Sequence, residues 1–246
     1  MRNYIYETHT HTKEASACAV CSAIESVHAH KEYGYTGMIL TNHFFYGNTS
    51  VDRKLPWSEW VRLFCKPYYI AKAEGEKIGL QVFFGWEAGY HGTEFLIYGL
   101  DENWLLCHPQ IKDAAISEQY KMVHADGGLV IHPHPFREED YIPEVRLFPE
   151  YVDGVEAYNA THVSEKSMAH RNPLFDERAR EYAEKYHFPM TAGSDTHRTA
   201  LLGGGMVFHR EISDIHDFCK AVVNRECVAF LDGSTKGDVF FHDQQK

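Results

Sequence analysis

Short apolar runs alternate with polar segments along the whole chain. Runs of four to eight apolar residues are typical of strands buried in a sheet. They predict strands over residues 4–8, 36–41, 80–84, 94–98, 128–131, 154–157, 188–192 and 206–209.

Between these strands, apolar residues recur three and four positions apart, as on one face of a helix. The first helical segment is closed by Gly34, and the second contains Pro67, which is expected to break it into two helices. A third helix is expected to begin near Pro173 and a fourth after Ser213, which would be its N-cap.

Alternation of strands and helices over the whole length implies a parallel sheet with helical crossovers. Seven or eight strands in 246 residues favour a closed α/β barrel over an open doubly wound sheet. An open sheet would be expected to carry a glycine-rich phosphate loop after its first strand, but residues 8–12 read Thr-His-Thr-His-Thr. We therefore expect a single barrel domain over residues 1–246.

The formal net charge is −11, and hydrophobic residues make up 44% of the chain. An acidic chain gains no counterion-release energy from a long phosphate backbone, which disfavours extended nucleic acid as a partner. A small phosphorylated substrate is compatible with this charge, because bound metal ions reverse its sign locally. No apolar run reaches the ~18–20 residues of a membrane span, and residues 1–7 contain no signal-peptide stretch. The expectation is a cytoplasmic protein without a membrane partner.

Only two of the six cysteines, Cys18 and Cys21, form a CxxC motif. A zinc module needs a second pair at matching spacing, and the sequence has none. The two are interpreted as reduced thiols flanking a helix start, with a redox pair or an accessory metal site as alternatives.

The 17 histidines are informative through their placement, because the active-site groups of a barrel project from the carboxyl ends of its strands. Six predicted strands are each followed by histidine or carboxylate: His9 and His11, His43, Glu87, His132 and His134, Glu156, Asp195 and His197. Each alone is compatible with an ordinary hydrogen-bonded polar residue. Together they would be costly to desolvate in one barrel mouth unless they bind metal. Imidazole and carboxylate suit Zn²⁺, Mn²⁺ or Fe²⁺.

Five segments resemble, in the same order, motifs of the PHP (polymerase and histidinol phosphatase) family of metal-dependent phosphoesterases. They are residues 8–12, 39–43, 85–87, 132–137 and 193–197. The resemblance implies a distorted seven-stranded (β/α) barrel that holds two or three divalent metal ions.

The resemblance also implies three metal positions, with Glu87 shared by the first two. The first would be held by His9, His11, Glu87 and Asp195, the second by Glu87 and His134, and the third by His43 and His197. His134 is preferred to His132 as the family's ligand because it precedes Pro-Phe-Arg.

Three positions depart from the family pattern. Ser16 stands where an Asp or His is common, Leu96 lies on a strand that often carries a histidine, and Asn42 replaces a common Asp. Three residues stay open as further ligands: Glu14, His132 and Glu156.

The leading functional hypothesis is hydrolysis of a small phosphomonoester or phosphodiester by a metal-bridging hydroxide. Glu87, Asp195 and His197 are the expected catalytic residues, and Arg137 and Arg198 would grip the phosphate. His197 or His132 would protonate the leaving group. The loops over residues 44–56 and 158–172 would cover the site and select the substrate.

Two alternatives stay open. One is hydrolysis of an amide or lactone at the same metal centre, and the other is a non-catalytic metal-binding regulatory domain. The sequence leaves the substrate, the identity of the metal and the oligomeric state undetermined.

Overall fold

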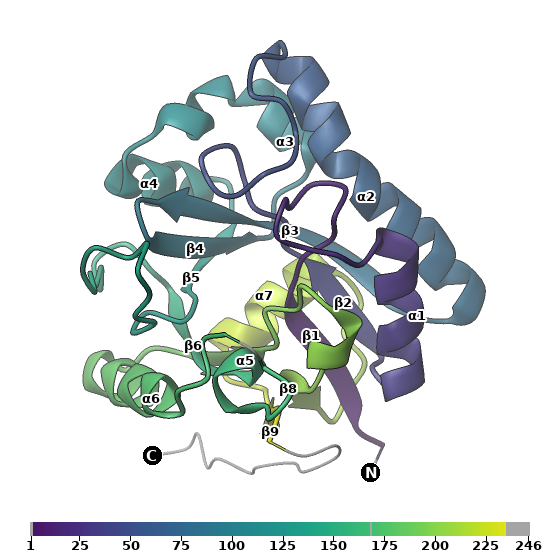
Figure 1. Ribbon diagram of the computed structural model, residues 1–246, viewed down its shortest axis with the longest axis vertical. Helices are drawn as coiled ribbons and strands as arrows, with labels where there is room; N and C mark the ends of the chain where they lie inside the picture. The colour runs from purple at the N-terminus through teal and green to yellow at the C-terminus, as the bar shows by residue number, and fades with distance from the viewer. Residues whose placement is uncertain (1, 168, 235–246) are drawn as a thin grey trace.

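Nine strands form one sheet in the computed structural model, which describes residues 2–167 and 169–234 (Figure 1). The sheet order is β7-β6-β5-β4-β3-β2-β1-β8-β9. The strands are β1 Tyr4–Thr10, β2 Gly37–Leu40, β3 Gln81–Tyr90, β4 Thr93–Tyr98, β5 Leu129–His132, β6 Gly154–Asn159, β7 Met190–Gly193, β8 Gly204–Phe208 and β9 Ala229–Asp232. Every predicted strand is confirmed, and β9 was not predicted.

The sheet curves into a barrel. β7 lies against β1 and β8, and Thr10 pairs with Thr196 beyond the strand ends, so the two sides of the sheet meet. The main outer helices are α1 (Ala23–Tyr33), α2 (Trp57–Ile78), α6 (Leu174–Tyr186) and α7 (Ile215–Val223) (Figure 1). The shorter helices are α3 (Glu102–Cys107), α4 (Ile116–Ala125) and α5 (Ala160–Val163). The predicted distorted α/β barrel is confirmed.

The expectation of an all-parallel sheet is wrong around β4 and β8. β4 pairs antiparallel with β3 and β5, and β8 pairs antiparallel with β1 and β9. The cause at β4 is a two-residue hairpin at His91 and Gly92, where φ is 51° and 86°. Two consecutive residues with positive φ are characteristic of type I′ hairpin turns. β4 therefore returns beside β3 without a helical crossover.

Two expectations about helices are also wrong. α2 runs through Pro67 without interruption, because its buried face continues on both sides of the proline, from Trp60 to Gly75, and packing of that face outweighs the lost hydrogen bond. The N-cap of α7 is Asp214, whose side chain accepts from the Asp217 N–H at 2.8 Å, rather than Ser213. α1 ends at Gly34 as predicted, with φ of 109° at the C-cap.

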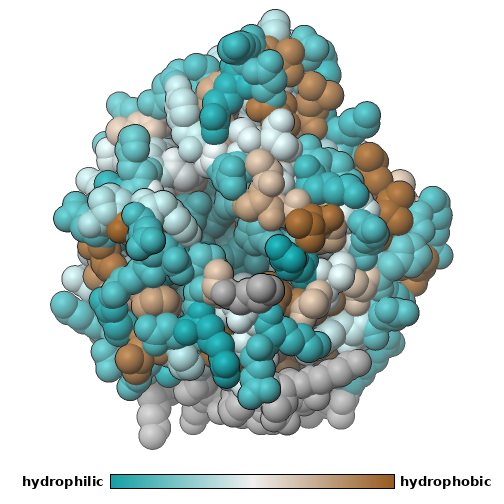
Figure 2. Space-filling model, in the orientation of Figure 1, coloured by the Kyte–Doolittle hydropathy of each residue, from teal (hydrophilic) through white to brown (hydrophobic). Residues whose placement is uncertain are grey.

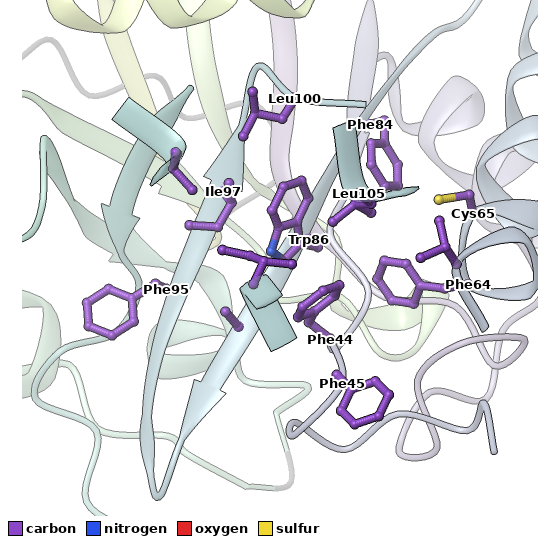
Figure 3. Close-up of a cluster of buried hydrophobic side chains, with 14 of the residues drawn as sticks. Phe44, Phe45, Phe64, Cys65, Phe84, Trp86, Phe95, Ile97, Leu100 and Leu105 are labelled. Atoms are coloured by element: carbon purple, nitrogen blue, oxygen red, sulfur yellow. The ribbon is translucent and has the colours of Figure 1, made fainter. Parts of the chain in front are cut away.

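A cluster of aromatic side chains packs beside the end of β2 and the middle of β3 (Figure 3). Phe44 lies 5.3 Å from Trp60 of α2 and 5.6 Å from Trp86 of β3, measured between ring centroids. Such pairs contribute about 0.5–1.5 kcal/mol each beyond the area they bury. Phe44 follows His43 and Trp86 precedes Glu87, so this core fixes the backbone at two candidate metal ligands.

No helix in the described part of the chain combines the length and the apolar composition needed to cross a bilayer.

His30 on α1 gives a pH-dependent stability that is independent of any metal. Burial lowers the pKa of this histidine to about 4, and its Nδ1 lies 2.7 Å from the Ser26 carbonyl oxygen. The unfolded pKa is about 6.5. The stabilisation is therefore present above pH 6.5 and lost as the pH falls toward 4. Between pH 7 and pH 5, metal-free wild type should lose about 2 kcal/mol more unfolding free energy than His30→Gln. Denaturant titrations of both proteins at the two pH values measure this, and equal losses would contradict it.

Candidate metal centre

The first two histidines of the site are positioned by β1 and by the loop after β7. His9 and His11 are two residues apart, so their side chains leave the extended chain on the same side. The Thr196 N–H donates to the His9 carbonyl at 3.1 Å, and the His11 N–H donates to the Thr196 carbonyl at 2.9 Å. This pairing carries Asp195 and His197, the neighbours of Thr196, to the two histidines.

Four side chains converge where the resemblance implies the first metal position. His9 Nε2 lies 3.2 Å from Glu87 Oε1 and 3.5 Å from Asp195 Oδ1. His11 Nε2 lies 3.2 Å from Asp195 Oδ1 and 3.6 Å from Glu87 Oε2. All four residues are buried. The structure therefore brings together the residues of the predicted first position.

Glu87 lies at the middle of the cluster. Its Oε1 is 3.2 Å from His134 Nε2, and its Oε2 is 2.7 Å from His43 Nδ1. On the far side of His43, the Nε2 atoms of His43 and His197 are 3.5 Å apart. Each carboxylate oxygen of Glu87 therefore faces different imidazoles, which is the arrangement that a bridging carboxylate requires.

Several buried atoms at the centre have no hydrogen bond of acceptable geometry among the described residues. They are His9 Nε2, His11 Nε2, His43 Nδ1 and Glu87 Oε2. Buried polar atoms without partners are costly. A nitrogen and an oxygen ligand of one tetrahedral Zn²⁺ are about 3.3–3.5 Å apart when the Zn–N bond is about 2.05 Å and the Zn–O bond about 2.0–2.2 Å. The observed separations of 3.2–3.6 Å at the first position match that range. The donor set therefore fits a divalent cation.

The charges of the cluster are strongly coupled. Burial alone would raise the pKa of Glu87, but His9 and His43 outweigh burial and hold it well below its usual value. Burial is likewise outweighed at Asp195, where His9 and Arg137 keep the carboxyl pKa low. Burial, reinforced by the charges of His43 and His197, lowers the pKa of His11 well below its usual value. Against the effect of burial, the same carboxylates raise the pKa of His9 and of His43, so in the metal-free protein these two imidazoles hold protons that a bound cation would displace.

Two residues that depart from the family pattern, Ser16 and Asn42, make hydrogen bonds to His11 and to the loop that carries it. Ser16 Oγ lies 3.2 Å from His11 Nδ1 and donates to Asn42 Oδ1 at 2.9 Å. Asn42 Oδ1 also accepts from the Thr12 N–H at 2.7 Å. Ser16 and Asn42 thus fix the ring of His11 and the loop that carries it, as hydrogen-bonding partners of metal ligands commonly do.

The three residues left open as further ligands lie outside the cluster. Glu156 Oε1 is 3.0 Å from His9 Nδ1, so it orients that ring from behind. Glu14 accepts from the Ala23 N–H at the start of α1. His132 stacks on Phe95 at 5.3 Å between ring centroids, and burial lowers the pKa of this histidine to about 3. His132 therefore lies in the aromatic core, which argues against its proposed role as a proton donor.

Glu94 is a candidate ligand that the sequence analysis missed. Its Oε2 is 3.6 Å from His134 Nε2, and its Oε1 is 3.8 Å from His43 Nδ1. His43, Glu87 and Glu94 form one of the groups whose ligand atoms lie within 4.8 Å of one another. Glu94 and Leu96 share a face of β4, because residues two apart in a strand point the same way. A carboxylate two residues before Leu96, on the same face of the predicted strand, is the feature of the sequence that could have indicated a ligand at Glu94.

The two arginines predicted to grip phosphate have different environments. Arg137 is buried, its Nη2 lies 2.7 Å from Asp195 Oδ2, and its Nε donates to His162 Nε2 at 3.3 Å. Arg198 is exposed and contacts no residue of the cluster in any ion pair or hydrogen bond of the described chain. Arg137 is therefore part of the site's own charge network, whereas Arg198 stays a prediction.

Two candidate ligands have strained backbones. φ is 30° at His134 and 52° at Asp195, both in the left-handed region. Such residues cost about 1–3 kcal/mol each and concentrate at functional sites. The His134 N–H is held at this angle by donation to Glu156 Oε2 at 3.2 Å.

Fold and site together define a class: an α/β barrel with a cluster of metal-ligand side chains at its strand ends. A family model described as PHP-associated matches residues 173–227, which include Asp195 and His197. No curated protein sequence matches the chain.

Solved structures extend the likeness to the whole fold. A two-domain protein from Bacteroides vulgatus that contains a predicted PHP-like metal-dependent phosphoesterase is 13% identical, with a TM-score of 0.65 over 98% of this chain. The chain spans only 65% of that protein's length. A candidate metal-dependent phosphoesterase from Bifidobacterium adolescentis is also 13% identical, with a TM-score of 0.51 over 87% of this chain and 94% of its own.

An amidohydrolase from Chromobacterium violaceum with bound sulfate is 11% identical, with a TM-score of 0.53 over 78% of this chain and 87% of its own. At these identities the neighbours establish the fold. The PHP-associated match and the PHP-like fold together confirm the resemblance to the PHP family.

Removal of metal is expected to destabilise the protein. A ligand at 1,000 times its dissociation constant adds about 4 kcal/mol to the free energy of unfolding. For a chain of this length, 1 kcal/mol corresponds to roughly 2–4 °C in Tm. Dialysis against a chelator should therefore lower Tm by about 8–16 °C, and added Zn²⁺ should restore it.

Elemental analysis of protein never exposed to chelator should find at least one transition metal per chain. A chain that stays metal-free after dialysis with Zn²⁺ or Mn²⁺ would refute the metal centre.

Proposed function

We propose that the chain is a metal-dependent hydrolase that cleaves a small phosphomonoester or phosphodiester. The observation that carries the proposal is the position of Glu87, whose two carboxylate oxygens face His9, His11, His43 and His134 at 2.7–3.6 Å. One carboxylate so placed serves adjacent cations, as catalysis by two metals requires. Structural neighbours described as metal-dependent phosphoesterases support the same reaction class.

His9, His11, Glu87, His134, Asp195, His43 and His197 would hold the cations. When bound, two or three divalent ions would lower the pKa of a coordinated water to about 7 and neutralise phosphate charge. The protein's own part is to orient the ligands and exclude water. His197 differs from the others because its side chain is 23% exposed. It therefore lies where a leaving group would meet the protein, and it would serve as proton donor only while the third metal position is empty, because a metal-bound nitrogen carries no proton.

The surroundings of the cluster favour phosphate over an uncharged substrate. Arg137 uses Nε and Nη2 for His162, Thr161 and Asp195, whereas its Nη1 makes no hydrogen bond in the described chain. A buried guanidinium with a free N–H beside the ligands can donate to a phosphate oxygen. Figure 2 shows a hollow lined by hydrophilic residues at the centre of the barrel face, as a small polar substrate would require. The net charge of −11 disfavours a long nucleic acid.

Amide or lactone hydrolysis is the second candidate function. It is supported by the likeness of the fold to the amidohydrolase, and the same ligands would serve it.

A substrate panel tests the proposal. Full-length protein loaded with Zn²⁺, Mn²⁺ or Fe²⁺ is assayed on phosphomonoesters, phosphodiesters, amides and lactones. Glu87→Gln, purified in parallel, measures contaminating phosphatase. We expect turnover of at least one phosphoester by wild type alone. Turnover of an amide or lactone alone would place the centre with the second candidate. Metal binding without turnover of any substrate would favour a regulatory domain.

A further inference from the structure

The first cysteine of the CxxC motif lies beside two candidate ligands. Cys18 Sγ is 3.2 Å from His43 Nε2, and the nearby rings of His197 and His43 outweigh the effect of burial and lower the pKa of the thiol. The two Nε2 atoms of these histidines are 3.5 Å apart. Cys18 lies before α1, His43 after β2 and His197 after β7, so three separate segments bring a sulfur and two nitrogens to one point.

A further buried nitrogen points to the same place. His11 Nε2 is buried, lies 3.2 Å from Asp195 Oδ1 and makes no hydrogen bond of acceptable geometry among the described residues. Its ligand atom lies within 4.8 Å of those of His43 and His197. The His11 ring also stacks on both other rings, with centroids 4.3 Å apart in each case. The ring of His11, a ligand of the first position, therefore packs on both histidines beside Cys18, so the sulfur lies at the edge of the same cluster.

The separations match a mixed sulfur and nitrogen site. Tetrahedral Zn²⁺ with Zn–N of about 2.05 Å and Zn–S of about 2.3 Å places two nitrogens about 3.3 Å apart and a nitrogen and sulfur about 3.6 Å apart. The observed values are 3.5 Å for His43 to His197 and 3.2 Å for Cys18 to His43. Small movements of side chains in a partly exposed loop would bring all three atoms to one cation.

We propose that Cys18 is a thiolate ligand of the metal position formed by His43 and His197. This assignment deepens the proposed function and rests on its metal centre. Ser16, at the position where the resemblance implies a ligand, contacts His11 and Asn42 and does not supply a ligand atom to the third position. On binding, the thiol proton passes to solvent and a sulfur–metal bond forms, with no change of oxidation state. A thiolate favours Zn²⁺ or Co²⁺ over Mn²⁺ or Mg²⁺.

Cys21 supplies the matched control. It is buried three residues along the same loop, and among the described residues its Sγ donates only to the backbone carbonyl oxygens of His11 and His197, at 3.7 and 3.6 Å. Cys21 therefore has no ring nitrogen beside it, although it shares the motif and the loop.

Cobalt titration tests the assignment without using activity. Reduced, metal-free wild type, Cys18→Ser and Cys21→Ser are each titrated with Co²⁺, and bound cobalt is measured by elemental analysis. Wild type and Cys21→Ser should show the near-ultraviolet charge-transfer band of a cobalt thiolate, and Cys18→Ser should lack it. In competition, Cys18→Ser should lose at least about tenfold in preference for Zn²⁺ over Mn²⁺, since even partners that only orient a ligand are worth roughly 10–100-fold.

Three outcomes would overturn the assignment: a band that persists in Cys18→Ser, wild type that binds cobalt without a band, or wild type that binds no cobalt. Cys18→Ala, at the same exposed position, replaces the serine variant if that variant does not fold. A band in wild type combined with no hydrolysis of any phosphoester would refute the proposed function and leave the thiolate ligand standing.

Discussion

Glu87→Ala is expected to remove more metal from the protein than His43→Ala does. The oxygens of Glu87 face imidazoles assigned to different metal positions, whereas His43 is assigned to the third position alone. Loss of a shared carboxylate therefore disables two positions at once. kcat/KM on the best phosphoester should fall by much more than the roughly 10–100-fold that loss of an outer-shell partner costs. Metal stoichiometry and steady-state kinetics of the two variants measure this.

Glu156→Gln is the matched control for Glu87→Ala. Glu156 is also a buried carboxylate beside His9, but it contacts the Nδ1 side of the ring, away from the cluster. Its replacement should weaken metal affinity by roughly 10–100-fold and leave the stoichiometry at saturating metal unchanged. Circular dichroism of each variant checks folding. Equal metal loss in Glu87→Ala and His43→Ala would reduce Glu87 to a terminal ligand.

The strand ends could be predicted from the sequence because they follow from local pattern. A buried strand is an apolar run, and the residue after it lies at the carboxyl edge of the sheet. This rule was enough to select His9, His43, Glu87 and Asp195, which the structure brings together. It needed no knowledge of how the strands pair, so the mistaken all-parallel sheet did not affect it.

Contacts that depend on the pairing of strands could not be predicted. Glu94 reaches the cluster because the hairpin at His91 and Gly92 turns β4 back beside β3, and Glu94 pairs with Gly89 across it. In a parallel sheet the start of a strand lies at the edge opposite the site. Glu94 was therefore missed as long as β4 was taken to be parallel.

Contacts between side chains that are far apart in the chain could not be predicted from the sequence pattern either. Cys18 was interpreted as a thiol at a helix start, yet the loop that holds it folds back over His43, 25 residues away. Arg137 was assigned to phosphate because it follows a ligand motif, although its nearest partner is Asp195. Side chains that approach from separate loops have no common spacing in the sequence, so only tertiary structure shows them.

Because Arg137 pairs with Asp195, its replacement should lower both the stability of the metal-free protein and kcat/KM. In Arg137→Ala the buried carboxylate of Asp195 would lose a guanidinium 2.7 Å away. Breaking one partner from a buried ion pair costs about 3–5 kcal/mol, so metal-free Arg137→Ala should be destabilised by that amount. Loss of a charged hydrogen bond of roughly 1.5–3 kcal/mol should also lower kcat/KM by about one to two orders of magnitude. Arg137→Lys should recover part of both, because lysine keeps the charge without the planar fork.

Inhibition by inorganic phosphate separates the two roles of Arg137. If its guanidinium grips the substrate, the inhibition constant for phosphate should rise in Arg137→Ala at saturating metal. If it only positions Asp195, metal affinity should fall while the inhibition constant stays the same. Arg198→Ala, which removes an exposed guanidinium next to His197, tests the second predicted phosphate contact. Arg210→Ala is the control, because Arg210 pairs with Asp217 and Glu226 on the surface. If Arg137→Ala matches Arg210→Ala in stability, metal affinity and kcat/KM, both roles are wrong, and the Asp195 carboxylate is held by the cations and the histidines alone.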